Sequence, residues 1–359
     1  YEAGSVLKPL TVALALDKKR ITPDTWFKTG YKKFDITGGQ SVSDDDYFES
    51  IPVTDIIVHS SNIGTSQISW LLTGKEFREG LLKFGLAQKT GIDLSRDLPG
   101  SLKPLRLLNH KMHRANSSFG YGMMVTFTQL MKAYSAFNND GLAVTPRLVD
   151  YLQDAKGKHY TLPPKIGNMQ AVSKKAANQI HDILLEVVKR GTGVAAQYPG
   201  LEVGGKTGTA HIAKKGRYVR EYHSSFYGFA NDKEGHKYTI GAMVIRAKKR
   251  YKYFASQSAV PTFRRMLDIL VELDYLKPEG GLEVASPEIK VEPKSPPKII
   301  HEPTVPQKEK KKKVTVKPVK KPTPSVKELF KLEPKPDPKP VNTKPAKDKS
   351  THELFEDLF

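Results

Sequence analysis

The sequence predicts a mixed α/β fold, in which an antiparallel sheet is flanked by helices and followed by a disordered tail. Three strand-like runs follow one another with only short polar segments between them, at 201–212, 221–230 and 238–247. This is the pattern of an antiparallel meander. Apolar residues recur at helical spacing in three further segments, at 126–138, 173–190 and 261–273. From about Ser286 the chain turns to Pro and Lys, a composition that cannot offset the entropy of ordering a chain.

A buried helix is predicted over residues 5–17, because apolar residues there leave hardly any polar face. Pro9 is unfavourable in that helix: it lacks an amide donor, so we expect the carbonyl near Ser5 to lose its usual partner. Residues 21–50 are rich in Gly, Asp and Thr and predict loops with short strands.

A turn at Ser60-Ser61-Asn62 separates two further predicted helices. Thr54 is expected to cap the first, which runs to about His59. The second is expected to begin near Gly64.

Two parts are predicted: a folded domain, 1–278, closed by Pro278, and a Lys/Pro-rich tail, 279–359. The chain carries a net charge of +20, and residues 286–359 contain 18 lysines against 11 acidic residues, so the folded part is basic too. A cationic surface suits nucleic acid, acidic lipid or a carboxylate-bearing polymer, without choosing among them.

The absence of cysteine excludes disulfides, thiolate metal sites and cysteine nucleophiles. Because the chain does not begin with Met, we expect it to be a fragment of a longer protein.

Three short polar motifs occur in an informative order: Ser5-Val6-Leu7-Lys8, Ser60-Ser61-Asn62 and Lys206-Thr207-Gly208-Thr209. Each is common by chance: another S-x-x-K match lies in the tail, and another K-T-G at Lys89-Thr90-Gly91, to which we assign a structural role. The predicted structural context of the first matches makes them more significant than chance matches. Ser5 and Lys8 share one face of a buried helix, and Lys206 lies on a strand preceded by two glycines, where a ligand can approach the backbone.

These residue types suit serine acyl transfer without a catalytic histidine. Ser5 is the candidate nucleophile, and Lys8, its helical neighbour, is the candidate base. An unperturbed lysine is almost never neutral at pH 7, so this role requires a pKa lowered by burial and by the positive charge of Lys206. Ser60 is expected to carry the proton onward to the leaving amine, and Asn62 to hydrogen-bond Lys8 or a substrate amide.

The candidate substrate-binding residues are Thr207, Gly208 and Thr209, together with Lys206. A cation, hydroxyls and strand-edge amides form a receptor for an extended peptide that ends in a carboxylate and binds by strand addition. The backbone amides of Ser5 and Thr209 are expected to form the oxyanion hole.

The chain resembles the transpeptidase domain of class B penicillin-binding proteins, from Tyr1 to about Pro278. Further segments fall in family order: Tyr1-Glu2-Ala3-Gly4-Ser5, Phe84-Gly85, Thr90-Gly91-Ile92-Asp93-Leu94, Phe119-Gly120-Tyr121-Gly122 and Val125-Thr126. The segment 119–122 is more similar to the division-specific (FtsI-like) branch than to the elongation branch. The chain departs from the family at Ala3, where Pro is usual, at His211, where Gln is common, and at Ser256-Gln257-Ser258, which replaces a glycine-rich stretch.

The resemblance implies a D,D-transpeptidase of septal peptidoglycan synthesis, at the periplasmic face of the bacterial inner membrane. Ser5 would attack the D-Ala-D-Ala bond of a stem peptide, release D-Ala and pass the acyl group to an amine on a neighbouring strand, and β-lactams would acylate the same serine. No cofactor, metal or nucleic acid is implied. Before Tyr1 the family has a membrane-anchoring helix, a pedestal domain and the first sheet strands. Its partners would include a lipid-II polymerase and other division proteins.

The residues leave other functions open. One alternative is a protein of the same fold that hydrolyses or senses β-lactams. Another is an elongation-type transpeptidase, which carries the same motifs. A third is a non-catalytic scaffold, against which the intact motifs argue. Asp44-Asp45-Asp46 is interpreted as a solvated acidic turn in preference to a calcium loop, and His59 as a packing or capping residue. In the tail, Glu328-Leu329-Phe330 and Glu353-Leu354-Phe355 are hypothesised to be docking motifs that fold on a partner.

Overall fold

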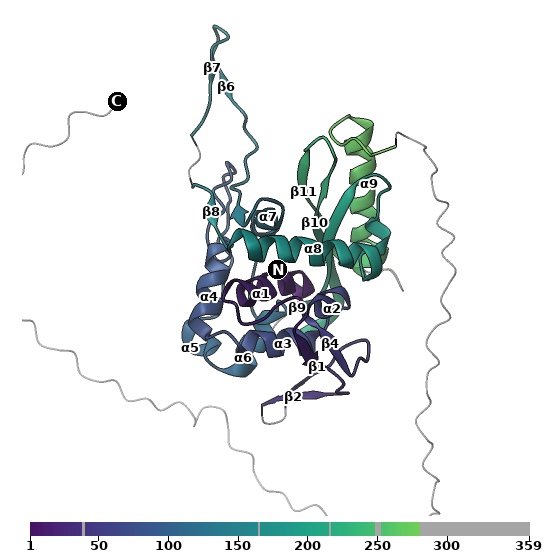
Figure 1. Ribbon diagram of the computed structural model, residues 1–359. Coiled ribbons are helices and arrows are strands. Elements are labelled where there is room, and N and C mark those ends of the chain that lie inside the picture. The colour runs from purple at the N-terminus through teal and green to yellow at the C-terminus, as the bar shows by residue number, and fades with distance from the viewer. Residues whose placement is uncertain (38–39, 164–165, 215–216, 248–252, 281–359) are drawn as a thin grey trace, which may run out of the picture. The chain divides into compact units, whose positions relative to one another are not determined.

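The computed structural model describes residues 1–280 apart from 38–39, 164–165, 215–216 and 248–252 (Figure 1). The predicted tail therefore lies outside the described residues from 281 onward. The predicted meander is confirmed by three strands that pair antiparallel in the order β11-β10-β9: β9 (Glu202–Lys214), β10 (Arg217–Asn231) and β11 (Lys237–Ala247).

Side chains of β10 divide between two apolar cores, because successive residues of a strand point to opposite faces of a sheet. Tyr227 and Phe229 join the larger core, which is built mainly from helices. Phe226 joins the smaller core, where its ring lies 4.7 Å, centroid to centroid, from that of Phe263 on α9 (Ala259–Glu272). Helices therefore cover both faces of the sheet, as predicted.

The larger core is formed by seven of the described helices: α1 (Lys8–Asp17), α2 (Val53–Val58), α3 (Asn62–Trp70), α4 (Gly74–Lys83), α5 (Leu105–Leu108), α7 (Phe127–Ser135) and α8 (Lys174–Arg190). Helix α6 (Lys111–Ser118) instead packs through Ala115 in a third, smaller cluster. Four 3₁₀ turns join them or the sheet: η1 (Gly4–Leu7), η2 (Ala136–Asn138), η3 (Val194–Ala196) and η4 (Ala255–Gln257). Short strands pair as β1 (Trp26–Lys28) with β4 (Ser50–Pro52), β2 (Phe34–Thr37) with β3 (Gln40–Val42), β5 (Leu142–Ala143) with β8 (Met169–Gln170), and β6 (Leu152–Gln153) with β7 (His159–Tyr160).

The first predicted helix is entered through a 3₁₀ turn. The α-helix proper begins at Lys8, so Pro9 is its second residue, where an amide would have no intrahelical acceptor. The Ser5 carbonyl accepts a hydrogen bond from the Lys8 N–H instead. The carbonyl therefore lacks its usual i+4 donor, as predicted, because Pro9 has no N–H, but the tighter turn supplies a substitute.

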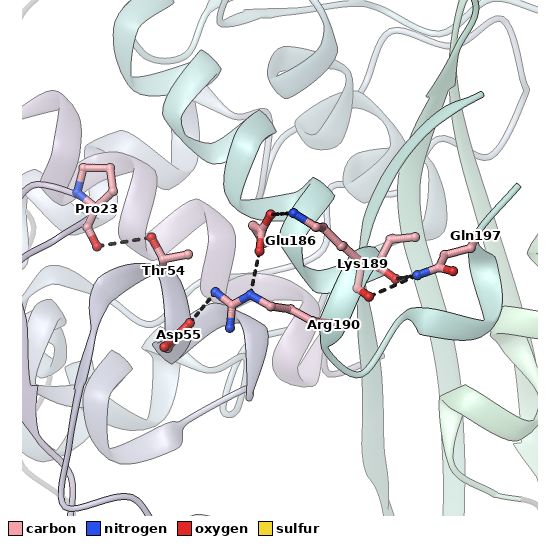
Figure 2. Close-up of polar contacts among 8 residues, drawn as sticks. Pro23, Thr54, Asp55, Glu186, Lys189, Arg190 and Gln197 are labelled. Carbon is pink, nitrogen blue, oxygen red and sulfur yellow. Dashed lines mark hydrogen bonds and ion pairs between the residues drawn. The ribbon is translucent and has the colours of Figure 1, made fainter. Parts of the chain in front are cut away.

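Helix α2 begins two residues earlier than expected. Pro52 occupies its N-cap position, so Thr54 is not the cap but lies inside the first turn. The Thr54 hydroxyl donates to the Pro23 carbonyl at 3.2 Å, which ties the helix to a preceding loop (Figure 2). The Thr54 hydroxyl, which the local sequence pattern assigned to capping, is thus used in a contact with a residue distant in sequence.

An ion pair fastens α2 to α8. Arg190, the last residue of α8, donates to Asp55 at 2.6 Å and to Glu186 at 2.6 Å (Figure 2). Because α2 leads directly into Ser60, this pair helps to fix the second polar motif against the sheet-covering helix.

An apolar groove of about 560 Å³ runs along β11 between α7 and α9. Among its lining residues are Phe127, Met131, Tyr238, Ile240, Met266 and Leu270. Among the described residues, no helix combines the length and the apolar character that crossing a bilayer demands.

Candidate active site

Ser5 lies half-buried in the η1 turn, which packs against strand β9. A Cβ built on Gly4 would lie 3.2 Å from the Cβ of Ala210, and one built on Gly208 would lie 2.7 Å from Val6 Cγ1. The residues on both sides of Ser5 therefore meet β9 within or just beyond the Lys206 motif. The structure thus brings the candidate nucleophile to the candidate substrate-binding strand, and small residues permit this approach.

The segment 119–122 supports the Ser5 turn from another side. Gly4 N–H donates to the Gly120 carbonyl at 3.3 Å. Gly120 has φ of +90°, and a Cβ there would overlap the backbone of Gly4. Gly122 N–H donates to the Glu2 carboxylate at 2.7 Å. Glycine at 120 is therefore required both by the backbone conformation and by the contact.

The Lys8 amine is completely buried and touches Ser60. Its Nζ donates to Ser60 Oγ at 3.1 Å and also to the Ser60 carbonyl. Burial lowers the pKa of Lys8 to about 7, although the nearby carboxylates of Asp44 and Asp45 act in the opposite direction. At neutral pH a substantial fraction of Lys8 is therefore unprotonated, as a base must be.

Lys206 is also completely buried, and its pKa is lowered well below the usual value by burial and then by the charge of Lys8. The repulsion between the two buried amines disfavours the state in which both are protonated. Burial therefore favours the uncharged form of Lys206 in the absence of an anion. A carboxylate bound nearby would raise its pKa again.

The hydroxyls of the Lys206 motif already have partners. Lys206 Nζ lies 3.4 Å from Thr207 Oγ1, which in turn lies 2.7 Å from the hydroxyl of Thr192. Thr209 Oγ1 accepts from the Ala255 N–H at 3.3 Å. The structure therefore joins Lys206 to Thr207 and directs Thr209 to η4. Among the described strands β9 pairs only with β10, which leaves its other edge to the η1 side for strand addition.

Ser60 follows α2 in a left-handed conformation, with φ of +61°. Such a backbone is uncommon for a residue with a side chain. Here it directs both oxygen atoms of Ser60 to the same amine. The ring of His59 lies 4.4 Å, centroid to centroid, from that of Phe48, which confirms a packing role for His59.

Asn62 is not brought to Lys8 in this structure. Its side-chain amide donates to the Ser43 carbonyl at 3.0 Å. It is also the first residue of α3, which begins two residues earlier than predicted because the Ser61 hydroxyl caps the Gly64 N–H at 2.9 Å. Asn62 therefore directly follows Ser60 and Ser61 in the chain, and its amide is bound by a loop far back in the sequence.

Asp44 is the residue that sequence reasoning misjudged. It was interpreted as part of a solvated turn, but its carboxylate accepts from Ser61 Oγ at 2.5 Å, from Asn62 N–H at 2.5 Å and from Ile63 N–H at 3.0 Å. A carboxylate is favourable at a helix N-terminus, and this one is close enough to raise the pKa of Lys8. The acidic run itself was the available signal, but only the fold places it beside the second motif.

The second K-T-G match has the structural role predicted for it. Thr90 is buried and donates to Asp97 at 3.1 Å, while its carbonyl accepts from the buried Lys132 amine at 3.0 Å. These contacts tie a loop to α7.

No group of three His, Asp or Glu side chains that could hold a metal occurs within the part of the chain that the structure describes.

The chain matches the family described as penicillin binding protein transpeptidase domain over residues 1–268. It is 30% identical over 268 residues to the probable peptidoglycan D,D-transpeptidase PenA of Neisseria flavescens, covering 74% of this chain and 63% of that protein. It is 30% identical over 285 residues to the peptidoglycan D,D-transpeptidase FtsI of Buchnera aphidicola, covering 79% of this chain and 47% of that protein. The chain thus spans roughly half of such relatives. Its fold is similar to that of penicillin binding protein 3 from Mycobacterium tuberculosis complexed with aztreonam, with a TM-score of 0.68 and 27% identity, covering 79% of this chain and 65% of that one. The chain therefore belongs to the family of penicillin-binding protein transpeptidase domains.

Proposed function

We propose that this protein is a serine D,D-transpeptidase that cross-links peptidoglycan stem peptides through an acyl-enzyme on Ser5. The observation that carries the proposal is the buried Lys8 amine, one turn from Ser5, with a pKa of about 7 and a 3.1 Å hydrogen bond to Ser60 Oγ. An amine in that state can take a proton from a serine hydroxyl at neutral pH, and a surface lysine cannot.

The first half-reaction uses the three motifs in sequence. Lys8 takes the Ser5 proton as Oγ attacks the carbonyl of the D-Ala-D-Ala bond, and the C–N bond then breaks. Ser60, hydrogen-bonded to Lys8, passes the proton to the departing amine of D-Ala. In the second half-reaction the acceptor amine attacks the Ser5 ester, and its proton returns through Lys8 to Ser5 Oγ. Atoms and charge balance without a cofactor.

Substrate binding is proposed at the unpaired edge of β9. An extended peptide would add as a strand there, with its terminal carboxylate near Lys206 and the hydroxyl of Thr207. Because burial lowers the pKa of Lys206 in the empty site, a carboxylate bound beside it would raise that pKa and favour the protonated amine. We keep the amides of Ser5 and Thr209 as the proposed oxyanion hole, and Asn62 and Gly208 as residues lining the substrate.

β-Lactams are proposed to acylate Ser5 by the same route. Support comes from the family itself and from the relative that was crystallised with aztreonam. When a β-lactam ring opens, the leaving amine stays attached to the acyl group and cannot diffuse away. The acyl-enzyme would therefore persist unless water were activated. A β-lactam-hydrolysing or β-lactam-sensing protein of this fold is the alternative.

Septal synthesis at the periplasmic face of the inner membrane is the finer part of the proposal. Support comes from the 119–122 segment and from the similarity to FtsI. An anchor outside this sequence, a lipid-II polymerase and other division proteins would be its partners. Depleting the protein from its own host should block septation and produce filaments. Rounded cells would favour the elongation-type alternative.

The acyl-enzyme is tested with fluorescent penicillin on the full-length protein, by following label over time. We expect stable label that is lost in Ser5→Ala but kept in Ser95→Ala, which alters an exposed serine of the loop that precedes α5. Rapid release of label would identify a hydrolase. Absence of label in the unchanged protein would leave only a scaffold role.

A further inference from the structure

The surface formed by α5, α6 and the segment leading into them is strongly basic. The chain contains no Asp or Glu between Leu98 and Asn139. Three cations of this stretch reach the surface, and we call them the α6 basic patch: Lys103, Arg106 and Lys111. Two others of the stretch, Arg114 and Lys132, are instead buried and donate to backbone carbonyls.

No ion pair neutralises the α6 basic patch within the described part of the chain. Lys111 Nζ lies 5.4 Å from the centroid of the Trp70 ring, a contact that leaves the charge available. His113 lies close enough to Lys103 and His110 for their charges, together with burial, to lower its pKa. Cations therefore gather here without a carboxylate between them.

The patch extends to the Ser5 turn. A Cβ built on Gly122 would lie 2.7 Å from Lys103 Nζ, so this amine lies directly over the 119–122 segment. Gly122 N–H binds Glu2, and Gly4 N–H binds the Gly120 carbonyl. Glu2 lies at the inner end of the patch, and Asp45 is close enough to Tyr121 to affect its pKa. A ligand bound to Lys103 would therefore lie beside the residues that flank the nucleophile.

Two walls flank the Ser5 turn, one formed by β9 and the other by residues 119–122 and α6, and they differ in the groups available for binding. The β9 wall supplies a strand edge, to which the proposed donor peptide binds in extended form. The wall formed by residues 119–122 and α6 supplies positive charge. Because the acceptor must reach the Ser5 ester while the donor acyl chain still lies along β9, the basic wall is the free approach.

We propose that the α6 basic patch binds the acceptor substrate: an amine-bearing peptide with at least two free carboxylates, held by Lys103, Arg106 and Lys111 while its amine reaches Ser5. This rests on the proposed transpeptidase function and adds the chemistry of its second substrate. Attack of that amine forms the new C–N bond, breaks the bond between the acyl carbon and Ser5 Oγ, and returns the amine proton to Ser5. Opposite charge at the rim adds selectivity and encounter rate.

The test compares two triple variants of the full-length protein that lose the same charge. The patch variant carries Lys103→Gln, Arg106→Gln and Lys111→Gln. The control variant carries Lys156→Gln, Lys175→Gln and Lys237→Gln, which removes three exposed cations from other elements. None of the six residues belongs to the catalytic machinery, so labelling by fluorescent penicillin should be unchanged in both and verifies that each is folded.

The readout is transfer of an acyl group from a thioester analogue of acyl-D-Ala-D-Ala to one of two acceptors. One is an amine-bearing tripeptide with two free carboxylates, and the other is the same tripeptide with both carboxylates amidated. In the patch variant we expect kcat/KM for the acidic acceptor to fall about tenfold, mainly through KM, since three exposed pairs are lost. Transfer to the amidated acceptor should not change. The preference for the acidic acceptor should also weaken with added salt.

Three results would overturn the inference: equal use of both acceptors by the unchanged protein, equal losses for both acceptors in the patch variant, or the same selective loss in the control variant. Each of these leaves penicillin labelling intact, so the transpeptidase proposal survives them. Failure of the unchanged protein to take up label would instead remove the proposed function, and this inference with it.

Discussion

At the scale of single residues, the site depends on two buried lysines whose charge is set by their surroundings. Lys8 keeps a pKa of about 7 because Asp44 and Asp45 oppose part of the effect of burial. Lys206 has no such compensation in the empty site, and its pKa falls well below the usual range. One lysine is thus prepared to act as a base, and the other to respond to an anion.

The Asp44→Asn variant should shift the pH dependence of acylation toward acid. The carboxylate raises the pKa of Lys8, so removing its charge lowers that pKa and lets the neutral amine form at lower pH. The amide is also a weaker acceptor for the α3 N-terminus, so we expect labelling by penicillin to slow about tenfold at its plateau. Rates between pH 5 and 9 are the measurement.

Asp46→Asn is the matched control, because Asp46 is exposed and does not appear among the groups that perturb Lys8. It should leave both the midpoint and the plateau unchanged. An unshifted midpoint in Asp44→Asn would mean that this residue acts only as a helix cap.

Lys8→Met should change how stability varies with pH. The folded pKa of about 7 is below the value of 10.5 for an exposed lysine, so folding releases a proton between these values, and the unchanged protein gains stability as pH rises through that window. The variant cannot. From pH 7 to pH 9 the unchanged protein should therefore gain about 2 kcal/mol relative to Lys8→Met, measured by urea unfolding. Parallel stabilities at the two pH values would contradict a buried, titrating Lys8.

At the scale of elements, the Ser5 turn is positioned by backbone that approaches it closely from β9 and from the 119–122 segment. Gly120 is the tightest of these contacts, and it also requires a positive φ. The turn is therefore held by packing of main chain against main chain, in addition to side-chain contacts. Such contacts tolerate no added methyl group.

Gly120→Ala should unfold the site locally. The new methyl overlaps the Gly4 backbone and the residue must keep φ of +90°, so we expect a loss of about 3 kcal/mol or more and very slow labelling by penicillin. Gly235→Ala has a similar φ of +97° with nothing within 4 Å of the added Cβ. It should cost only about 1 kcal/mol, with normal labelling. Equal thermal shifts in the two variants would show that the contact with Gly4 is unimportant.

The elements with strong periodicity were predictable from sequence, and the local starts of helices were less so. The meander and the helices at 126–138 and 173–190 follow from spacing alone, because each buries one face. Thr54 looked like a cap, but its hydroxyl is used by Pro23, and Pro9 looked like a defect, but the 3₁₀ turn accommodates it. Local pattern does not contain these contacts.

The same division holds for the site. Spacing placed Ser5 and Lys8 on one helical face. A hydrogen bond to Lys8 was expected from Asn62, but the structure forms it with Ser60, whose Oγ lies 3.1 Å from Lys8 Nζ. The partner of Asn62 and the role of Asp44 depend on how a loop folds back on α3. No spacing in the sequence encodes that encounter.

At the scale of the whole molecule, two apolar cores share the sheet between them, and the last buried residue of either among the described residues is Leu276. The ion pair between Lys277 and Glu234 and the hydrogen bond from Glu279 to Gly200 fasten the chain just beyond it. Within residues 1–280 the chain is therefore fastened to the domain as far as Glu279.

Deleting residues 286–359 should accordingly leave penicillin labelling unchanged and alter the free energy of unfolding by less than about 0.5 kcal/mol. Urea unfolding of the two forms is the measurement. A clear loss of stability would place part of the core in the deleted segment. The hypothesised docking motifs of the tail are tested by the same deletion in cells, where septal recruitment and partner capture should fall although catalysis does not.

Fluorescent reporters of unfolding face a particular difficulty with this protein. The apolar groove along β11 is lined by Phe127, Tyr238, Met266 and other apolar side chains and opens to solvent. A solvatochromic dye can therefore bind to the native state. Emission would then be high before heating and the apparent transition would be blunted. Far-ultraviolet circular dichroism avoids this interference, and displacement of such a dye offers a direct way to titrate whatever else fills the groove.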